Sequence, residues 1–118
     1  QALNSIVDDG EKRFLYILDS GYPTDEYIAF LTTQKPVDLV IADVTMGFME
    51  GHPYDYHMTI AENAKLKKVL TKNGFFKPTA KWVCTHFTHN SCRSYAECEK
   101  ECAKDDMIAA YDGMEIEL

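Results

Sequence analysis

Apolar and polar positions follow different spacings along the chain, and each change of spacing marks a predicted element. Apolar segments at residues 3–7 and 13–18 flank the turn residues 8–11, a pattern typical of a β-hairpin. Residues 37–44 are almost continuously apolar, which is typical of a strand buried on both faces. Residues 81–85 predict a further short strand. The pattern therefore predicts a hairpin followed by two inner strands.

Three helices are predicted from capping residues that precede apolar positions at helical spacing. Thr24 can cap the first helix, because the acidic residues that follow it suit the positive end of the helix dipole. Thr59 and Glu62 have the spacing of a capping box at the start of the second helix. Ser94 and Glu97 repeat that spacing at the third. The predicted helices cover residues 24–33, 59–73 and 94–104.

The end of the chain predicts a second hairpin, because residues 107–111 and 114–118 flank Asp112 and Gly113. The predicted order is therefore ββ-α-β-α-β-α-ββ. Strands that alternate with helices favour an α/β fold with a largely parallel central sheet and right-handed crossovers. We expect residues 1–118 to form a single domain.

Composition excludes several classes of protein. With 46% hydrophobic residues in 118, the chain is too apolar to be intrinsically disordered. Its 19 acidic and 12 basic side chains give a net charge of −7, which would repel a phosphate backbone. No apolar run approaches the roughly 20 residues that a membrane span needs. We therefore expect neither a nucleic-acid nor a membrane partner.

The chain starts at Gln1, and its first residues lack the charged and apolar segments of a signal peptide. We therefore expect a cytoplasmic protein, of which this chain is a piece, with its four cysteines as reduced thiols. Cys98 and Cys102 lie one helical turn apart, which fits a buried apolar stripe better than a zinc site. The cysteines are therefore interpreted as structural.

Ionisable residues end three of the predicted strands, at Asp19, Asp43 and His86. Ligand sites of open α/β sheets collect at the carboxyl ends of the strands, so these side chains are expected at one rim. His89 follows three residues after His86, and the loop after Asp43 brings His57 to the same edge. The sequence therefore predicts a cluster of imidazole and carboxylate groups.

Imidazole and carboxylate groups are suitable ligands for zinc, manganese or iron. Such an ion lowers the pKa of a bound water to about 7 and so supplies hydroxide at neutral pH. Simpler interpretations stay open, since Asp19 could cap a turn and Asp43 could bind loop amides. His52, beside a glycine and a proline, is interpreted as a surface residue. His86 is harder to explain in this way, because an imidazole at a buried strand end needs partners.

Some of the same acids resemble those of response-regulator receiver domains. Asp8 and Asp9 provide an acid pair, and Asp43 ends an inner strand. Lys77 then precedes a proline. A receiver's acid pair, however, ends the first strand and leads into a helix, whereas this pair leads into a second strand. A receiver-like or non-catalytic α/β interaction module is therefore the alternative interpretation.

Three sequence blocks carry a more specific resemblance. They are Tyr-Ile-Leu-Asp-Ser-Gly at 16–21, Thr-His-Phe-Thr-His at 85–89 and Tyr-Asp-Gly-Met-Glu-Ile at 111–116. In this order they resemble the carboxy-terminal half of metallo-β-lactamase-fold hydrolases, nearest to the phosphodiesterase branch of the PhnP phosphoribosyl cyclic phosphate hydrolases. The likeness spans nearly the whole chain. It implies the C-terminal half of an αββα sandwich and the metal-dependent hydrolysis of a phosphodiester such as a cyclic phosphate.

The resemblance also implies roles for individual residues. Asp19 matches an aspartate that bridges two metal ions, and His86 matches a histidine that ligates one of them. His57 matches a histidine that assists catalysis or holds the substrate phosphate. His89 and Asp43 are assigned to substrate binding or to the surroundings of the ligands. Two divalent ions, zinc or manganese, are the implied cofactors.

The family's H-x-H-x-D-H motif, which supplies most of the metal ligands, is absent from this chain. The motif would precede residue 1, so the isolated chain is expected to be inactive. The implied partners are a small phosphoester substrate and the missing N-terminal half of the same protein. A homo-oligomer is also expected, because a sheet edge left bare by that missing half would favour pairing with another copy.

Overall fold

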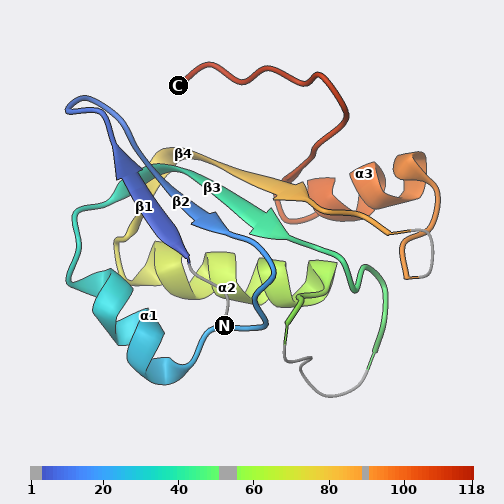
Figure 1. Cartoon of the computed structure of the whole chain (residues 1–118), viewed down its shortest axis with the longest axis horizontal. Helices are drawn as coiled ribbons and strands as arrows, with labels where there is room; N and C mark the ends of the chain where they lie inside the picture. The colour runs from blue at the N-terminus through green and yellow to red at the C-terminus, as the bar shows by residue number, and fades with distance from the viewer. Residues whose placement is uncertain (1–3, 51–55, 89–90) are drawn as a thin grey trace.

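One five-stranded sheet organises the chain, with its strands in the order β1-β2-β3-β4-β5 (Figure 1). The computed structural model describes residues 4–50, 56–88 and 91–118. The strands are β1 (Ser5–Asp8), β2 (Arg13–Ile17), β3 (Val37–Asp43), β4 (Phe76–Thr85) and β5 (Ile108–Ala109). β1 pairs with β2 in the antiparallel sense, and every other neighbouring pair is parallel. The predicted hairpin and the predicted parallel sheet are both confirmed.

The helices begin at the residues that the capping patterns predict. They are α1 (Asp25–Thr32), α2 (Ile60–Lys72) and α3 (Tyr95–Ala103). The Thr24 hydroxyl accepts a hydrogen bond from the backbone of Tyr27, and Ser94 caps α3 in the same way. Both hydrogen bonds of the capping box between Thr59 and Glu62 are present. Because these caps satisfy amides that the first turn leaves unpaired, local sequence is sufficient to fix where each helix starts. None of the helices in the described part has the length and apolarity to cross a bilayer.

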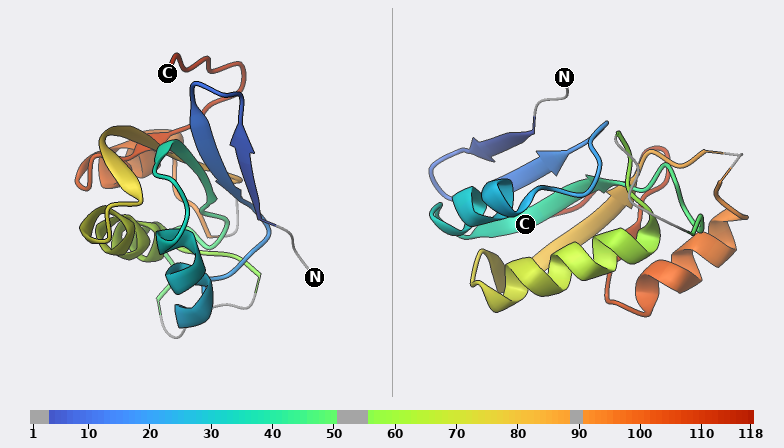
Figure 2. Two further views of the ribbon diagram at one scale, coloured as in Figure 1. Left: turned by 90° about the vertical axis from the view of Figure 1, so that its left-hand side faces the viewer. Right: turned by 90° about the horizontal axis from the view of Figure 1, so that it is seen from below.

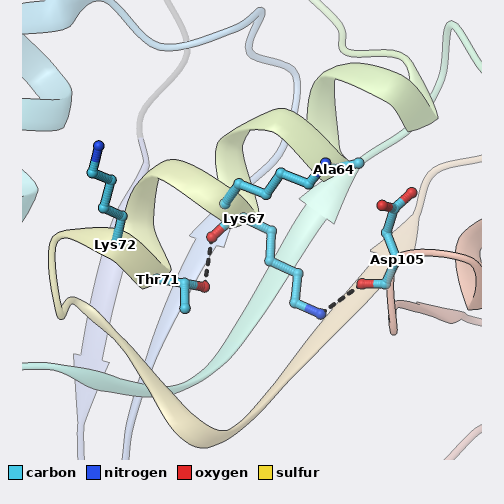
Figure 3. Close-up of a pocket in the computed structure, with 6 residues that line it drawn as sticks. Ala64, Lys67, Thr71, Lys72 and Asp105 are labelled. Atoms are coloured by element: carbon cyan, nitrogen blue, oxygen red, sulfur yellow. Dashed lines mark hydrogen bonds between the residues drawn. The ribbon is translucent and has the colours of Figure 1, made fainter.

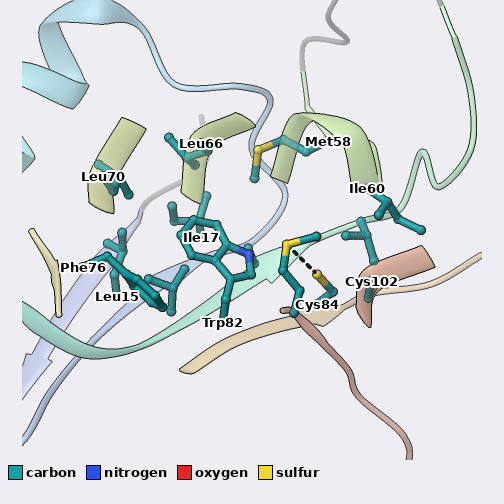
Figure 4. Close-up of a cluster of buried hydrophobic side chains, with 14 of the residues drawn as sticks. Leu15, Ile17, Met58, Ile60, Leu66, Leu70, Phe76, Trp82, Cys84 and Cys102 are labelled. Carbon is teal, nitrogen blue, oxygen red and sulfur yellow. Dashed lines mark hydrogen bonds between the residues drawn. The ribbon is translucent and has the colours of Figure 1, made fainter. Parts of the chain in front are cut away.

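The core lies between the sheet and the layer formed by α1 and α2, which cover the same face of the sheet (Figures 1 and 2). Alternate residues of the strands point into this layer, as the period of a strand requires. Six of them have no exposed surface: Leu15, Ile17, Val40, Ala42, Trp82 and Cys84. Leu66 and Leu70 of α2 pack in the same cluster (Figure 4). Each of the larger aliphatic side chains, such as Leu15 or Ile17, contributes about 1.5–3 kcal/mol when it leaves water.

The opposite face of the sheet carries the chain's own C-terminal segment (Figure 1). Met114 and Ile116 of this segment, together with Leu39, Ile41 and neighbouring residues, line a groove of about 460 Å³. The ammonium group of Lys81 donates a hydrogen bond to the carbonyl oxygen of Glu117 at 2.8 Å. This face is therefore apolar and only partly covered.

The second predicted hairpin, of residues 107–111 and 114–118, is wrong. The Asp112–Gly113 turn does form, since the Met114 amide donates to the Tyr111 carbonyl at 3.0 Å. The only strand there is β5, which runs parallel to β4, and residues 114–118 belong to no strand. After the turn, the chain crosses the face of the sheet instead of returning along its edge. The turn residues alone do not predict the direction of the segment that follows them.

The predicted strand at residues 81–85 is too short, because β4 begins at Phe76. Phe76 pairs with Val37 at the start of β3, and the register shifts between Val37 and Leu39. Between Phe76 and the predicted start at residue 81, β4 contains Lys77 and Pro78. A charged residue and a proline are not typical of a strand, so the sequence pattern does not indicate this part of β4.

Candidate metal centre

Four ionisable side chains meet at the carboxyl edge of the parallel strands. Asp19 follows β2, Asp43 ends β3, His86 follows β4, and His57 lies shortly before α2. Each offers one ligand atom, and these four atoms all lie within 4.8 Å of one another. The structure thus brings Asp19, His57 and His86 together with Asp43, as the strand-end pattern predicts. His52 and His89 lie outside the described residues.

Two of these residues leave their strands through an unusual backbone conformation. Asp19 has a φ of 53° and His86 has a φ of 70°, both in the left-handed region. Residues other than glycine adopt this region rarely, at a cost of order 1 kcal/mol each, and such residues cluster at functional sites. The turn at both strand ends directs the Asp19 carboxylate and the His86 imidazole toward the same point, with 3.6 Å between Oδ1 and Nε2.

Asp43 is the buried centre of the cluster, and its side chain has no exposed surface. Its carboxylate accepts hydrogen bonds from the backbone amides of Asp19 and Thr45, at 2.9 and 2.7 Å. It also lies 2.8 Å from Nδ1 of His57. Three donors compensate the carboxylate for the water that it has lost. Asp43 is therefore the buried member of the cluster, and it holds the His57 ring.

The hydrogen bonds also determine which ring nitrogens are free. A carboxylate only accepts, so His57 must donate from Nδ1 and keeps its Nε2 for other contacts. The Thr45 hydroxyl donates its one proton to the carbonyl oxygen of His86 at 2.8 Å. The same hydroxyl lies 2.5 Å from Nδ1 of His86, which must therefore be the donor. We assign Nε2 of both histidines as unprotonated in the neutral rings, the form that a metal ion requires.

These residues fit a divalent ion in both donor chemistry and spacing. Zinc binds imidazole nitrogen and carboxylate oxygen at about 2.0–2.2 Å, so two ligand atoms of a tetrahedral site lie about 3.4 Å apart. The 3.6 Å between His86 Nε2 and Asp19 Oδ1 is close to that value. Thr45 orients the His86 ring and Asp43 orients the His57 ring, as hydrogen-bonded partners do around metal sites. The set is therefore a candidate metal centre.

Sequence reasoning missed the polar residues that support this edge. Thr45 fixes the ring of His86, and the Ser91 hydroxyl donates to the Thr45 carbonyl. Asn63 is fully buried in α2, and its side-chain amide donates to the Asp43 carbonyl at 2.8 Å. Thr, Ser and Asn are common in loops and near helix starts, so no pattern in the sequence distinguishes these three from ordinary capping residues.

The cysteines contribute to packing. Cys84, Cys98 and Cys102 are buried in the core, as the structural interpretation predicts. Burial raises the pKa of the Cys98 thiol to about 11, with Cys92 and Cys102 adding to the effect. Cys92 is half-buried near the candidate centre, where its thiol donates to the Val44 carbonyl at 3.6 Å.

The receiver-like alternative does not fit the sheet. Asp8 ends β1, which runs antiparallel to β2, and it is paired with Arg13 at the start of β2. Asp43 ends β3, which is parallel to β2, so it lies at the other end of the sheet. Lys77 pairs with Asp38, near the start of β3. The acids and the lysine of a receiver site are therefore held apart.

The sheet order, the crossover helices and the cluster at the strand ends define the class: the fold is that of metallo-β-lactamase-like proteins. The particular likeness is to the crystal structure of the metallo-β-lactamase fold protein YhfI from Bacillus subtilis, with a TM-score of 0.67 and 22% identity. The match covers 94% of this chain and 42% of that one, so this chain spans less than half the length of YhfI. No family model and no curated protein matches the sequence.

Proposed function

We propose that this chain is the C-terminal portion of a metal-dependent hydrolase that cleaves a phosphodiester, in the PhnP-like branch of the fold. The observation that carries the proposal is the cluster of Asp19, Asp43, His57 and His86, with both imidazoles oriented by partners behind them. The left-handed backbone at Asp19 and His86 supports a role for both as ligands, because strained conformations persist where a function needs them.

Asp19 and His86 would help to hold two divalent ions, zinc or manganese. When bound, such ions would polarise a phosphoryl oxygen and make hydroxide available near neutral pH. His57 would donate a proton to the leaving oxygen or a hydrogen bond to the phosphate. Asp43 would stabilise the protonated imidazole, because its carboxylate lies 2.8 Å from Nδ1. His89 remains a candidate for substrate binding.

This portion supplies too few ligands for two ions. Asp19 and His86 offer one carboxylate and one imidazole, so most of each coordination sphere would have to come from elsewhere. We assign the remaining ligands to an H-x-H-x-D-H segment in the missing N-terminal half. The apolar, partly covered sheet face that bears Leu39 and Ile41 supports a partner of that kind, because a second sheet would bury it.

The test is to measure metal content and hydrolysis of bis-p-nitrophenyl phosphate, for the 118-residue chain alone and joined to the preceding half. The chain alone should bind zinc or manganese weakly and turn over no faster than its His86→Ala variant. The joined protein should bind the metal tightly and hydrolyse the phosphodiester.

Two variants of the joined protein separate the proposed roles. His86→Ala should lose bound metal and activity together. His57→Ala should keep its metal and lose activity by about 10²–10⁴-fold, as expected for a proton donor. A joined protein that binds metal but hydrolyses no phosphodiester would contradict the proposed substrate. Strong turnover by the 118-residue chain as a monomer would contradict the ligand assignment.

A further inference from the structure

Asn63 is a fully buried polar side chain in the first part of α2, where apolar residues would be expected. Its amide nitrogen donates to the carbonyl oxygens of Asp43 and Thr59, at 2.8 and 3.0 Å. Its amide oxygen accepts from the indole nitrogen of Trp82 at 2.9 Å. One side chain therefore joins the end of β3, the start of α2 and the middle of β4.

The orientation of this amide is determined by its partners. The Trp82 indole can only donate, so it must face the amide oxygen. The two backbone carbonyls can only accept, so they must face the amide nitrogen. All three hydrogen bonds would be lost or opposed if the amide were turned over. Asn63 is therefore held in one conformation inside the core.

The segment that Asn63 ties down is the one that carries His57. Thr59 follows His57 by two residues, and Asp43 is the residue that binds the His57 ring. The backbones of the two segments also touch through Gly47, whose carbonyl accepts from the Ile60 amide at 2.9 Å. The Asn63 amide joins these two segments through its hydrogen bonds to the Asp43 and Thr59 carbonyls.

We infer that Asn63, braced by Trp82, is a positioning residue that sets the hydrogen bond between His57 and Asp43. Its hydrogen bonds go to the Asp43 and Thr59 carbonyls and to the Trp82 indole, so it acts through the backbone of Asp43 and Thr59. The inference deepens the proposed function and rests on it for its catalytic meaning. The geometric part, that Asn63 holds the backbone from which Asp43 fixes the His57 tautomer, does not depend on a metal.

The decisive variant is Asn63→Asp, which has nearly the same shape and keeps an oxygen for Trp82. Its second oxygen replaces the amide nitrogen and faces two carbonyl oxygens, so it opposes the contacts that Asn63 makes. The readout is the nitrogen-15 NMR spectrum of the His57 ring in the metal-free 118-residue chain at pH 8, which distinguishes the two tautomers. The natural chain should show the tautomer protonated at Nδ1, and the variant should show a mixture.

Leu70→Ala is the matched control, because Leu70 is buried in the same helix and makes no polar contact with the cluster. It should lower the melting temperature without changing the His57 spectrum. An unchanged spectrum in Asn63→Asp would overturn the inference. An equal change of the His57 spectrum in Leu70→Ala would also overturn it, because the effect of Asn63 would then be one of overall stability.

Trp82→Phe provides a second test if Asn63→Asp does not fold. It removes only the indole donor, so the amide loses its brace and keeps its two donated bonds. The His57 tautomers of Trp82→Phe should shift toward a mixture, but less than in Asn63→Asp. An unchanged His57 spectrum would overturn the role of Trp82. If Asn63→Asp also fails to fold, that result would overturn the whole inference.

Zinc titration of the same proteins separates this inference from the proposed function. If the proposed roles are right, Asn63→Asp in the joined protein should keep its zinc, as His57→Ala does, and lose part of the hydrolysis activity, because Asp19 and His86 are unchanged and only the His57 ring is disturbed. A changed tautomer in a chain whose natural form binds no zinc, even with its preceding half attached, would leave the positioning role intact. In that case the proposed metal chemistry would be what fails.

Discussion

Two aspartates of the same strand illustrate how residues at opposite ends of β3 acquire different roles. Asp43 binds two backbone amides and His57, all at the candidate centre. Asp38 accepts from the Arg13 amide and from the ammonium group of Lys77, at 2.9 and 2.8 Å. Asp43 is buried and Asp38 is partly buried, and both have hydrogen-bonded partners, but only Asp43 has an imidazole among them.

Asp43→Asn should shift His57 from one tautomer to a mixture. One amide orientation keeps the bonds from His57 and the Asp19 amide and opposes the Thr45 amide, whereas the other turns its NH₂ group to the ring, which then accepts at Nδ1. Loss of the charged acceptor should also lower the free energy of unfolding by about 1–3 kcal/mol. Asp38→Asn is the control, and it should leave the His57 nitrogen-15 spectrum unchanged. An unchanged His57 tautomer in Asp43→Asn would contradict the assigned network.

Asp38 should also make a measurable contribution to acid sensitivity. The hydrogen bond from Lys77 and the amide of Arg13 hold the pKa of Asp38 below its ordinary value of 3.8. Its contribution to stability is therefore complete above that value and is lost as the pH falls through the lower, folded pKa. Urea unfolding between pH 6 and pH 2 should show a smaller loss of stability for Asp38→Asn than for the natural chain. Parallel curves for the two proteins would exclude this contribution.

Cys98 should be nearly inert toward alkylation. With a pKa raised to about 11 by burial, its thiolate fraction at pH 8 is only about 0.1%, against roughly a quarter for a free cysteine. Iodoacetamide at pH 8, followed by peptide mass spectrometry, should label Cys98 far more slowly in the folded chain than in guanidinium. Rapid labelling of Cys98 in the folded chain would show that it is exposed.

At the scale of elements, the starts of the helices are local properties, whereas the path of the chain between elements is not. Each helix begins where a hydroxyl caps it, so its start can be predicted from a few residues. The turn at Asp112 and Gly113 is equally local, but the path of the chain after it depends on β4 and on the sheet face. The candidate centre belongs to the second kind, because it lies where separate elements end.

Gly47 is the clearest case of a loop residue fixed by a distant element. Its φ is 48°, and an added Cβ would lie 2.5 Å from the Ser91 carbonyl oxygen and 2.7 Å from the Cys92 sulfur. Gly47→Ala should therefore cost about 1–3 kcal/mol in urea unfolding, from steric overlap and backbone strain together.

Gly74→Ala is the matched control for this change. Gly74 also has a positive φ, of 79°, but an added Cβ there would meet nothing within 4 Å. Only the backbone strain applies, so its cost should be about 1 kcal/mol. Equal costs in the two variants would show that the contact between Gly47 and the segment of Ser91 can relax.

At the scale of the whole molecule, the two faces of the sheet are unequal. The face toward α1 and α2 is closed, whereas the other face exposes Val7 by 44% and Tyr16 by 39% of their surfaces. Val7 pairs with Phe14 across β1 and β2, so both side chains lie on this open face. An edge strand next to an apolar face favours pairing with another chain.

The isolated chain should therefore self-associate through this face. Val7→Lys should reduce the association seen by analytical ultracentrifugation, because a charge on an edge strand opposes pairing. Phe30→Lys is the control, since Phe30 is 51% exposed on α1, in the other layer. A monomeric natural chain, or an equal effect of both variants, would contradict association through the open face.

The sequence by itself determined the order of the elements up to β5, the start of each helix and the strand ends at which Asp19, Asp43 and His86 lie. These follow from local propensity and from the rule that parallel strands end at one edge. Only the tertiary structure decided that Asp43 is the buried member of the cluster, that Thr45 and Asn63 hydrogen-bond to residues of the cluster, and that the C-terminal segment crosses the sheet. Hydrogen bonds between residues some 20 to 40 positions apart set these features, as between Asn63 and Asp43 or Thr45 and His86, and no local pattern records such partners.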